Sequence, residues 1–268
     1  MTVPQEAPRS FGAPDGWVFD TDGVITRTAE VHRSAWAATF DGFLAGEDPA
    51  QRPFSDEDYL AHVDGRPRYD GVAAFLTSRG IHLPTGSPDD APGARTVCGL
   101  GNAKNRAFVA VLARDGVEAY PSTVDLVRHL RAMGVAVAAV SASRNQAAVL
   151  GAAGLEDAFD VRVDGLTAER RGLAGKPDPA IFLEAAHLLG LPPGRVAVVE
   201  DARSGVEAGR RGGFAPVIGV DRHGQAAELR SAGADVVVDD LSRLEVGADR
   251  WVRAVGAAPS GPAVQGAS

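Results

Sequence analysis

The sequence contains a single cysteine, Cys98, among its 268 residues. One cysteine excludes an intramolecular disulfide and a metal cluster built on several thiolates of one chain. Residues 1–16 lack a basic segment followed by an apolar one, and no apolar run approaches the roughly 18 residues that a membrane span requires. The sequence therefore indicates a reducing compartment, and we expect the protein to be cytoplasmic.

The chain also lacks any run of basic residues, and its formal net charge is -8 at pH 7. A nucleic acid or an anionic membrane is therefore excluded as the main partner. Hydrophobic residues make up 45% of the chain, enough for a substantial buried core. We expect a globular monomer that acts on a small molecule, with no nucleic-acid and no membrane partner.

Lysine is nearly absent: of the 27 basic residues, only Lys104 and Lys176 are lysines. A surface ion pair tolerates either basic residue, whereas a planar guanidinium does not reproduce a compact ammonium with three rotatable donors. The two lysines therefore indicate two sites that need an ammonium group. Coding bias alone is the alternative explanation at this point.

From Pro121 onward, short apolar runs alternate with segments of helical periodicity. Strands are predicted at residues 135–140, 161–163, 196–199, 216–220 and 235–238, and helices at residues 122–133, 146–153, 179–190, 204–211 and 225–232. Residues 16–20 add one more apolar strand far upstream. Strands joined by helical crossovers form a parallel sheet that is covered on both faces. The predicted fold is α/β, with a doubly wound, Rossmann-like parallel sheet.

Residues 30–116 lack this strand rhythm and predict an inserted α-helical cap domain. Its helices are expected at residues 30–43, 56–63, 69–80 and 102–115, with an exposed loop at residues 83–94. The core domain would then comprise residues 16–29 and 117–253. Residues 1–15 and 254–268 are rich in Pro, Gly, Ala and Ser without periodicity, so we expect flexible tails.

In a doubly wound sheet, ligands bind beyond the carboxyl ends of the strands. The polar residues that follow apolar runs or open a helical segment are Asp20, Asp22, Ser141, Lys176, Glu200 and Asp201. Taken alone, the segment Asp20-Thr21-Asp22-Gly23 is also a common turn sequence. Carboxylates crowded at one edge stay ionised only if a hard cation neutralises them, and Mg²⁺ takes oxygen ligands while keeping waters. The set therefore predicts a magnesium site.

These residues resemble the four signature motifs of the haloacid dehalogenase superfamily: Phe19-Asp20-Thr21-Asp22-Gly23-Val24, Ser141, Lys176 and Glu200-Asp201. The resemblance implies that Asp20 attacks phosphorus to form an aspartyl phosphate. It also implies that Asp20, the backbone carbonyl of Asp22 and Asp201 bind Mg²⁺, with Glu200 supporting the metal site.

The physical chemistry of the motifs agrees with those roles. A carboxylate is repelled by a phosphoryl dianion unless Mg²⁺ and Lys176 neutralise charge along the line of attack. Ser141 can hold a phosphoryl oxygen, and Asp22 can exchange a proton with the sugar oxygen as general acid and base. An exposed turn carboxylate is the alternative for Asp22.

Within the superfamily, the sequence is similar to the β-phosphoglucomutase family. The similarity extends beyond the first motif to Ile25, Thr26, Thr28, Ala29, Glu30, His32 and Trp36. It implies that His32 lies by the acid/base and that Trp36 lines the sugar site. The two residues are four apart and share one face of a helix, although a purely structural, buried Trp36 is an alternative.

Three further segments carry the same resemblance. In Gly65-Arg66-Pro67-Arg68, similar to the family's substrate-specificity loop, Arg68 would grip the phosphate remote from the reacting one, which suits a bidentate guanidinium. The pair Lys104-Asn105 matches a second family pair. The segment Ser141-Ala142-Ser143-Arg144-Asn145 matches the loop that holds the remote phosphate, with Arg144 where the family often has lysine. Both lysines of the chain thus fall on family positions.

The resemblance implies a mutase that interconverts β-D-glucose 1-phosphate and glucose 6-phosphate, with Mg²⁺ and catalytic β-glucose 1,6-bisphosphate as cofactors. One alternative is a sugar-phosphate or other small-molecule phosphatase, in which water receives the phosphoryl group. Another is a catalytically silent binding protein that only keeps the fold. The cap residues favour the mutase because a hydrolase need not hold a bisphosphate in two orientations, and the intact motifs argue against a silent protein.

Overall fold

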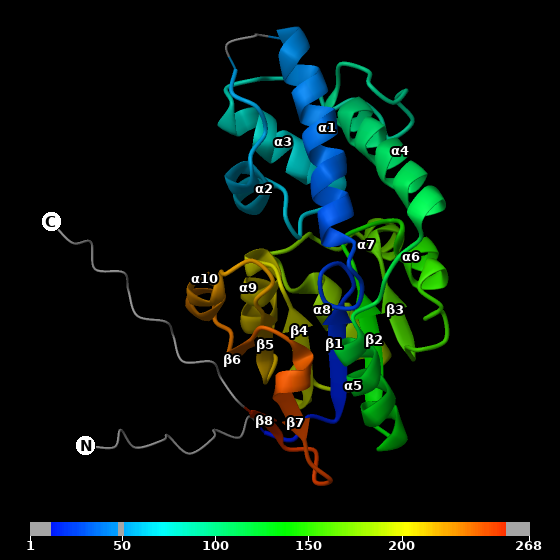
Figure 1. Ribbon diagram of the computed structural model, residues 1–268, viewed down its shortest axis with the longest axis vertical. Coiled ribbons are helices and arrows are strands. Elements are labelled where there is room, and N and C mark those ends of the chain that lie inside the picture. Colours follow the sequence, from blue (N-terminus) through cyan, green and yellow to red (C-terminus); the bar gives the residue numbers. More distant parts are fainter. Residues whose placement is uncertain (1–11, 48–50, 256–268) are drawn as a thin grey trace, which may run out of the picture.

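The computed structural model describes residues 12–47 and 51–255 as a sheet domain with a helical domain above it (Figure 1). The sheet has six parallel strands in the order β3-β2-β1-β4-β5-β6. These strands are β1 (Gly16–Asp20), β2 (Ala136–Val140), β3 (Val161–Val163), β4 (Val196–Glu200), β5 (Val217–Val220) and β6 (Val236–Val238). The predicted fold class, a doubly wound parallel sheet with a helical insertion, is confirmed.

Helices cover both faces of the sheet. They are α5 (Pro121–Ala132), α6 (Gln146–Ala152), α7 (Gly165–Arg171), α8 (Ala180–Leu188), α9 (Arg203–Arg211) and α10 (Ala226–Ala232), with the 3-10 turns η1 (Pro193–Arg195) and η2 (Leu241–Arg243). Side chains of β1 alternate between the faces. Val18 packs with α8, α9 and α10, whereas Trp17 and Phe19 pack with α5 and α6. Every residue of β1 and β4 is buried, as expected for central parallel strands.

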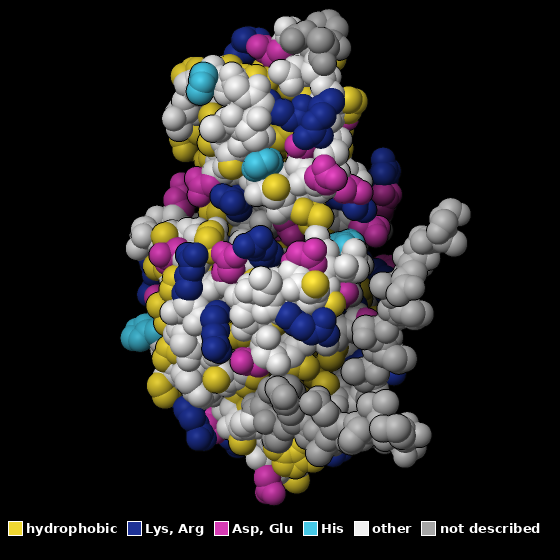
Figure 2. Space-filling view, turned by 90° about the vertical axis from the view of Figure 1, so that its left-hand side faces the viewer, with side chains coloured by type: hydrophobic (Ala, Val, Ile, Leu, Met, Phe, Trp, Pro, Cys, Tyr) yellow, Lys and Arg dark blue, Asp and Glu magenta, His cyan; other side chains and the backbone are white. Residues whose placement is uncertain are grey.

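The cap domain consists of four helices inserted between β1 and β2, and it stands over the carboxyl ends of the strands (Figure 1). The helices are α1 (Ala29–Glu47), α2 (Asp56–His62), α3 (Arg68–Ser78) and α4 (Val97–Asp115). The cap has a hydrophobic core of its own, in which the rings of Phe40 and Phe75 lie 4.1 Å apart between centroids. Two chain segments join the domains, and charged side chains gather across their junction (Figure 2).

One buried ion pair ties the cap together. Asp58 is 3% exposed and accepts hydrogen bonds from Arg79 at 2.6 Å and from Arg52 at 2.9 Å. It also forms a capping box with Ser55 at the start of α2. Although burial opposes ionisation, the hydrogen bonds from Arg79 and Ser55 hold the pKa of Asp58 below its usual value.

Several elements differ from the sequence predictions. Helix α4 begins at Val97 rather than residue 102 because Thr96 caps it, accepting from the Gly99 N–H at 2.9 Å. Helix α7 was not predicted; Asp164 caps it in the same way.

The end of the core domain contains two strands that the sequence analysis did not predict. Ala254, assigned to the C-terminal tail, belongs to the antiparallel hairpin of β7 (Leu244–Val246) and β8 (Val252–Ala254). The rest of both predicted tails lies largely outside the described residues. Among the described helices, none is long and apolar enough to cross a membrane.

Candidate active site

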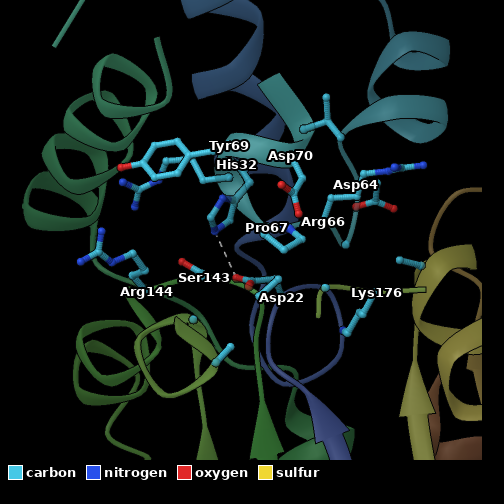
Figure 3. A pocket seen from close by; sticks show the side chains of 18 of the residues that line it. Asp22, His32, Asp64, Arg66, Pro67, Tyr69, Asp70, Ser143, Arg144 and Lys176 are labelled. Carbon is cyan, nitrogen blue, oxygen red and sulfur yellow. Dashed lines mark ion pairs between the residues drawn. The ribbon is translucent and has the colours of Figure 1, made fainter. Parts of the chain in front are cut away.

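A cavity of about 400 Å³ lies between the cap and the strand ends. The predicted site residues that line it are Asp20, Asp22, His32, Trp36, Gly65, Arg68, Lys104, Ala142, Ser143, Arg144, Asn145, Lys176 and Asp201. The other three, Asn105, Ser141 and Glu200, do not line the cavity but hydrogen-bond to residues that do. Figure 3 shows Lys176 and Arg144 on opposite sides of this space, with Asp22 between them.

At the Asp20 end, defined here as Asp20, Asp22, Lys176, Glu200 and Asp201, the parallel strands place acidic groups at one edge. Asp20 ends β1 and Glu200 ends β4, its neighbour in the sheet. The Lys176 ammonium donates to Asp20 Oδ1 at 2.5 Å and also to Glu200 Oε1. The other oxygen of Glu200 accepts from the Ala202 N–H at 2.8 Å. Lysine and two carboxylates thus form one buried cluster.

The electrostatics of this end indicate uncompensated negative charge. Burial raises the pKa of Asp20 well above its usual value; Lys176 opposes the shift, and the carboxylates Glu200 and Asp22 add to it. Burial also raises the pKa of Asp201, with Glu200 contributing next. Burial disfavours the charged form of Lys176, yet Asp20 and Glu200 raise its pKa above the usual range. One ammonium does not balance three carboxylates.

The cluster fits a magnesium ion. Asp20, Glu200 and Asp201 each offer a carboxylate oxygen, and these atoms lie within 4.8 Å of one another. Gly23 makes the arrangement possible: its φ is +86°, and a Cβ there would collide with the Asp201 carboxylate. An all-oxygen, partly buried donor set is typical of hard divalent cations.

Asp22 is held by three partners. Its Oδ1 accepts from the Thr28 hydroxyl, and its Oδ2 accepts from the Ser141 hydroxyl at 3.0 Å. His32 Nε2 lies 3.3 Å from Oδ1, the contact marked by the dashed line in Figure 3. Burial opposes ionisation, but His32 and the two hydroxyls keep the pKa of Asp22 well below its usual value. Asp22 is therefore a carboxylate that can accept a proton.

Helix α1 presents His32 and Trp36 to the cavity, one turn apart. Lys104, from α4, is hydrogen-bonded to His32 Nδ1; an ammonium can only donate, so opposite protonated Lys104 the ring proton of a neutral His32 lies on Nε2 and faces Asp22. Burial lowers the pKa of Lys104 to about 7 and also lowers that of His32. Trp36 is 4% exposed and stacks on Phe40 at 5.1 Å. It is therefore a cap-core residue that also lines the cavity.

At the Arg68 end, defined here as Arg68, Asn105, Ser143, Arg144 and Asn145, cap and core meet through one amide oxygen. Asn105 Oδ1 accepts from Arg68 at 2.7 Å and from the core residue Asn145 at 2.8 Å. Burial lowers the pKa of Arg68, and Arg144 adds to the shift. Two guanidinium groups and several N–H donors at this end fit an anion.

The structure adds cavity residues that the sequence analysis did not select. Asp64, Arg66, Tyr69 and Asp70 surround the predicted loop residues and line the cavity (Figure 3). Burial, with Glu200 contributing, raises the pKa of Asp64 to about 6. Their only sequence signal was adjacency to Gly65 and Arg68.

Comparisons with known proteins agree with this geometry. Residues 14–213 match the model of the haloacid dehalogenase-like hydrolase family. The chain is 46% identical over 254 residues to the β-phosphoglucomutase of Mycobacterium tuberculosis (strain CDC 1551 / Oshkosh), an alignment that covers 90% of this chain and 96% of that protein. It is 31% identical over 228 residues to the β-phosphoglucomutase of Bacillus subtilis, covering 85% of this chain and 90% of the relative.

A similar solved structure is that of β-phosphoglucomutase from Clostridium difficile. It superposes with a TM-score of 0.68 at 24% identity, covering 87% of this chain and 93% of the other. At that identity the likeness establishes the fold.

Proposed function

The chain belongs to the haloacid dehalogenase-like hydrolase family, and on that premise we propose that it is a β-phosphoglucomutase. The reaction would interconvert β-D-glucose 1-phosphate and glucose 6-phosphate through β-glucose 1,6-bisphosphate. The observation that carries the proposal is the pair of phosphate-compatible ends on one cavity, with the Asp22 carboxylate between them. The 46% identity to mycobacterial β-phosphoglucomutases supports the choice of substrate.

In this proposal, Asp20 is the nucleophile that accepts the phosphoryl group. Lys176, which donates to Asp20 Oδ1, would stabilise the negative charge on the transferring oxygens. Mg²⁺ held by Asp20, Asp201 and the carbonyl of Asp22, with Glu200 in support, would supply further charge neutralisation. Ser141 donates to Asp22 here, and we propose that it also reaches a phosphoryl oxygen.

Asp22 would act as general base and then general acid on the sugar oxygen. Its depressed pKa leaves it ionised and ready to take a proton from a hydroxyl that attacks phosphorylated Asp20. His32 Nε2 faces this carboxylate at 3.3 Å, and a Lys104 ammonium would fix the tautomer of His32. Trp36, Gly65 and the lysine-histidine pair would border the sugar.

The Arg68 end would hold the phosphate that is not reacting. Arg68, Arg144 and Asn145 line this end of the cavity, and Asn105 links them across the domain junction. A mutase requires the bisphosphate intermediate to bind in two opposite orientations, so that either of its phosphates can lie at the Asp20 end. A cavity with a phosphate site at each end allows both orientations.

The deciding experiment gives the protein Mg²⁺, β-glucose 1-phosphate and a trace of β-glucose 1,6-bisphosphate, and follows glucose 6-phosphate and inorganic phosphate together. The mutase proposal expects glucose 6-phosphate at a rate well above phosphate release. A second candidate is a sugar-phosphate phosphatase, favoured by the hydrolase character of the matched family. Phosphate release without glucose 6-phosphate would establish that candidate and overturn the mutase.

A further inference from the structure

The cap is attached to the core by a short two-stranded ribbon, which we call the hinge ribbon (residues 23–28 and 116–120). The Arg27 N–H donates to the Glu118 carbonyl at 2.8 Å, and the Tyr120 N–H donates to the Ile25 carbonyl at 2.9 Å. Both connections between the domains are therefore bonded to each other at the point where they leave the sheet.

Arg222 reaches this ribbon from a third part of the core, the loop after β5. Its side chain is 11% exposed. Its Nε donates to the Gly23 carbonyl at 2.9 Å, across 199 positions of the chain. Its guanidinium carbon lies 3.7 Å from the centroid of the Tyr120 ring, on the other strand of the ribbon. One guanidinium thus contacts both connections.

The far side of the guanidinium is anchored in the core. Arg222 Nη1 donates to the Asp239 carbonyl at 3.2 Å and lies 3.5 Å from the Asp240 carboxylate. Asp240 is itself held by the Ser122 hydroxyl at 2.8 Å. Because Asp239 and Asp240 hold the guanidinium on its core side, Arg222 can restrain the position of the Gly23 carbonyl instead of moving with it.

The position of Gly23 affects the geometry of the candidate metal site. It follows Asp22 directly, and its Cα faces the Asp201 carboxylate so closely that a Cβ would not fit. A shift of this peptide would change the spacing between the Asp20–Asp22 segment and Asp201, the two sides of the candidate metal site.

We propose that Arg222 is a positioning residue that holds the Gly23 carbonyl and thereby sets the spacing of the metal-binding carboxylates relative to the hinge ribbon. Arg222 lines a separate hollow of about 320 Å³ beside the hinge ribbon, and not the active-site cavity, so it would act without touching substrate. The inference rests on the proposed phosphoryl chemistry at Asp20 but not on the choice between mutase and phosphatase.

Three substitutions test the hydrogen bond directly. Arg222→Gln keeps an N–H donor the same number of bonds from the backbone as Nε, Arg222→Met has similar length and no donor, and Arg222→Lys keeps the charge. The readouts are Mg²⁺ affinity by calorimetry, the rate of Asp20 phosphorylation by acetyl phosphate, and the thermal unfolding midpoint. We expect Arg222→Met to lower both Mg²⁺ affinity and phosphorylation rate by about 10- to 100-fold, the usual effect of removing a residue that orients metal ligands. Arg222→Gln keeps the donor to Gly23 but loses the anchor to Asp239 and Asp240, so it should be impaired less than Arg222→Met.

The matched control is Arg27→Met. Arg27 also lies over the Tyr120 ring, at 4.6 Å, but it is half-exposed and donates no hydrogen bond to Gly23. The Arg27→Met variant should keep wild-type Mg²⁺ affinity and a wild-type rate of Asp20 phosphorylation. If Arg222→Met keeps wild-type values, or if Gln and Met are impaired equally, the proposal is wrong.

Folding and function remain separable in this design. If Arg222→Met does not fold, Arg222→Gln and Arg222→Lys, which both keep an N–H donor, are compared with wild type: near-wild-type affinity and rate in either variant supports the hydrogen bond, and a loss of about 10- to 100-fold in both overturns it. Failure of the proposed chemistry would be recognised differently, because the wild-type protein itself would then not react with acetyl phosphate.

Discussion

The two ends of the cavity are built in different ways. At the Asp20 end, Asp20 and Glu200 come from the carboxyl ends of adjacent parallel strands and Lys176 comes from the segment before α8, and each is at most 6% exposed. At the Arg68 end, they come from two cap helices and the loop after β2, and all are only partly buried. The parallel sheet positions Asp20 and Glu200, whereas the Arg68 end is complete only when cap and core meet at Asn105 and Asn145.

In the proposed mechanism, the Asp20 end carries out phosphoryl transfer and the Arg68 end binds the remote phosphate. A nucleophile and its counterions lose function with small displacements, so a sheet edge is a suitable support. In the proposed mutase, a phosphate clamp shared by two domains would open for exchange of ligand and close around it. Substitutions at the two ends should therefore differ in size and in kind.

The largest effect is expected from Asp20→Asn. The amide is nearly isosteric but cannot act as the nucleophile, so turnover should be abolished while the fold is kept. Steady-state activity and circular dichroism of the purified variant check this. Residual activity above a few per cent of wild type would remove Asp20 from its proposed role.

A smaller loss is expected from Asp22→Asn. Loss of general acid/base catalysis should slow phosphoryl transfer to sugar by about two to four orders of magnitude. Mg²⁺ affinity should change little, because the proposed ligand is the backbone carbonyl. Rapid-quench kinetics with parallel Mg²⁺ titration tests both halves. Normal turnover at saturating Mg²⁺ combined with weak Mg²⁺ binding would make the side chain a metal ligand instead.

Arg68→Ala should weaken binding of the remote phosphate and leave the reaction at Asp20 largely intact. We expect mutase kcat/KM to fall by about 2 to 4 kcal/mol in transition-state terms, the scale of losing a charge-assisted contact to the remote phosphate. Hydrolysis of acetyl phosphate at Asp20 should change far less, because that substrate has no remote phosphate. Arg33→Ala, at a partly exposed arginine of the same cap, is the matched control. Equal loss of both activities would contradict the clamp.

The smallest effect on catalysis is expected from Asp58→Ala, which tests the cap alone. Removing this carboxylate leaves Arg79 buried without its partner, and we expect a loss of about 3 kcal/mol in the free energy of cap unfolding. Denaturant unfolding measures it, while acetyl phosphate hydrolysis at low temperature should stay near wild type.

The same pair makes cap stability depend on pH. Because the pKa of Asp58 is depressed in the fold, its contribution is complete above the ordinary carboxyl pKa and is lost as pH falls through the depressed value. The acid-induced loss of stability should therefore be smaller in Asp58→Ala than in the wild type. An identical pH profile for the two proteins would contradict this assignment.

Much of the core could be predicted because buried parallel strands are short apolar runs. Residues 161–163 were predicted with the observed bounds, and the polar residues after the strands do meet at one edge. Helix α7 was missed because Gly165–Arg171 contains one large apolar residue and no helical stripe. The Arg222 contact with Gly23 joins residues that no local pattern relates.

The cap side of the site shows the same limit. The roles of His32 and Trp36 were suggested by resemblance and helical spacing, but the contact of Lys104 with His32 depends on how α1 packs against α4. Asp64 carried no signal of its own, because its burial beside the acidic cluster follows from where the cap rests on the core. Packing between domains is a property of the folded chain rather than of any window of sequence.

The hinge ribbon also bears on how such a chain can be assembled from modules. The cap leaves and re-enters the core through two segments already hydrogen-bonded to each other, so the insertion places its ends side by side. An insert with adjacent ends does not require β1 and β2 to separate. A different helical module that begins and ends at the same ribbon could therefore replace this one without altering strand order, which makes the ribbon a natural junction for exchanging substrate recognition over a constant phosphoryl-transfer core.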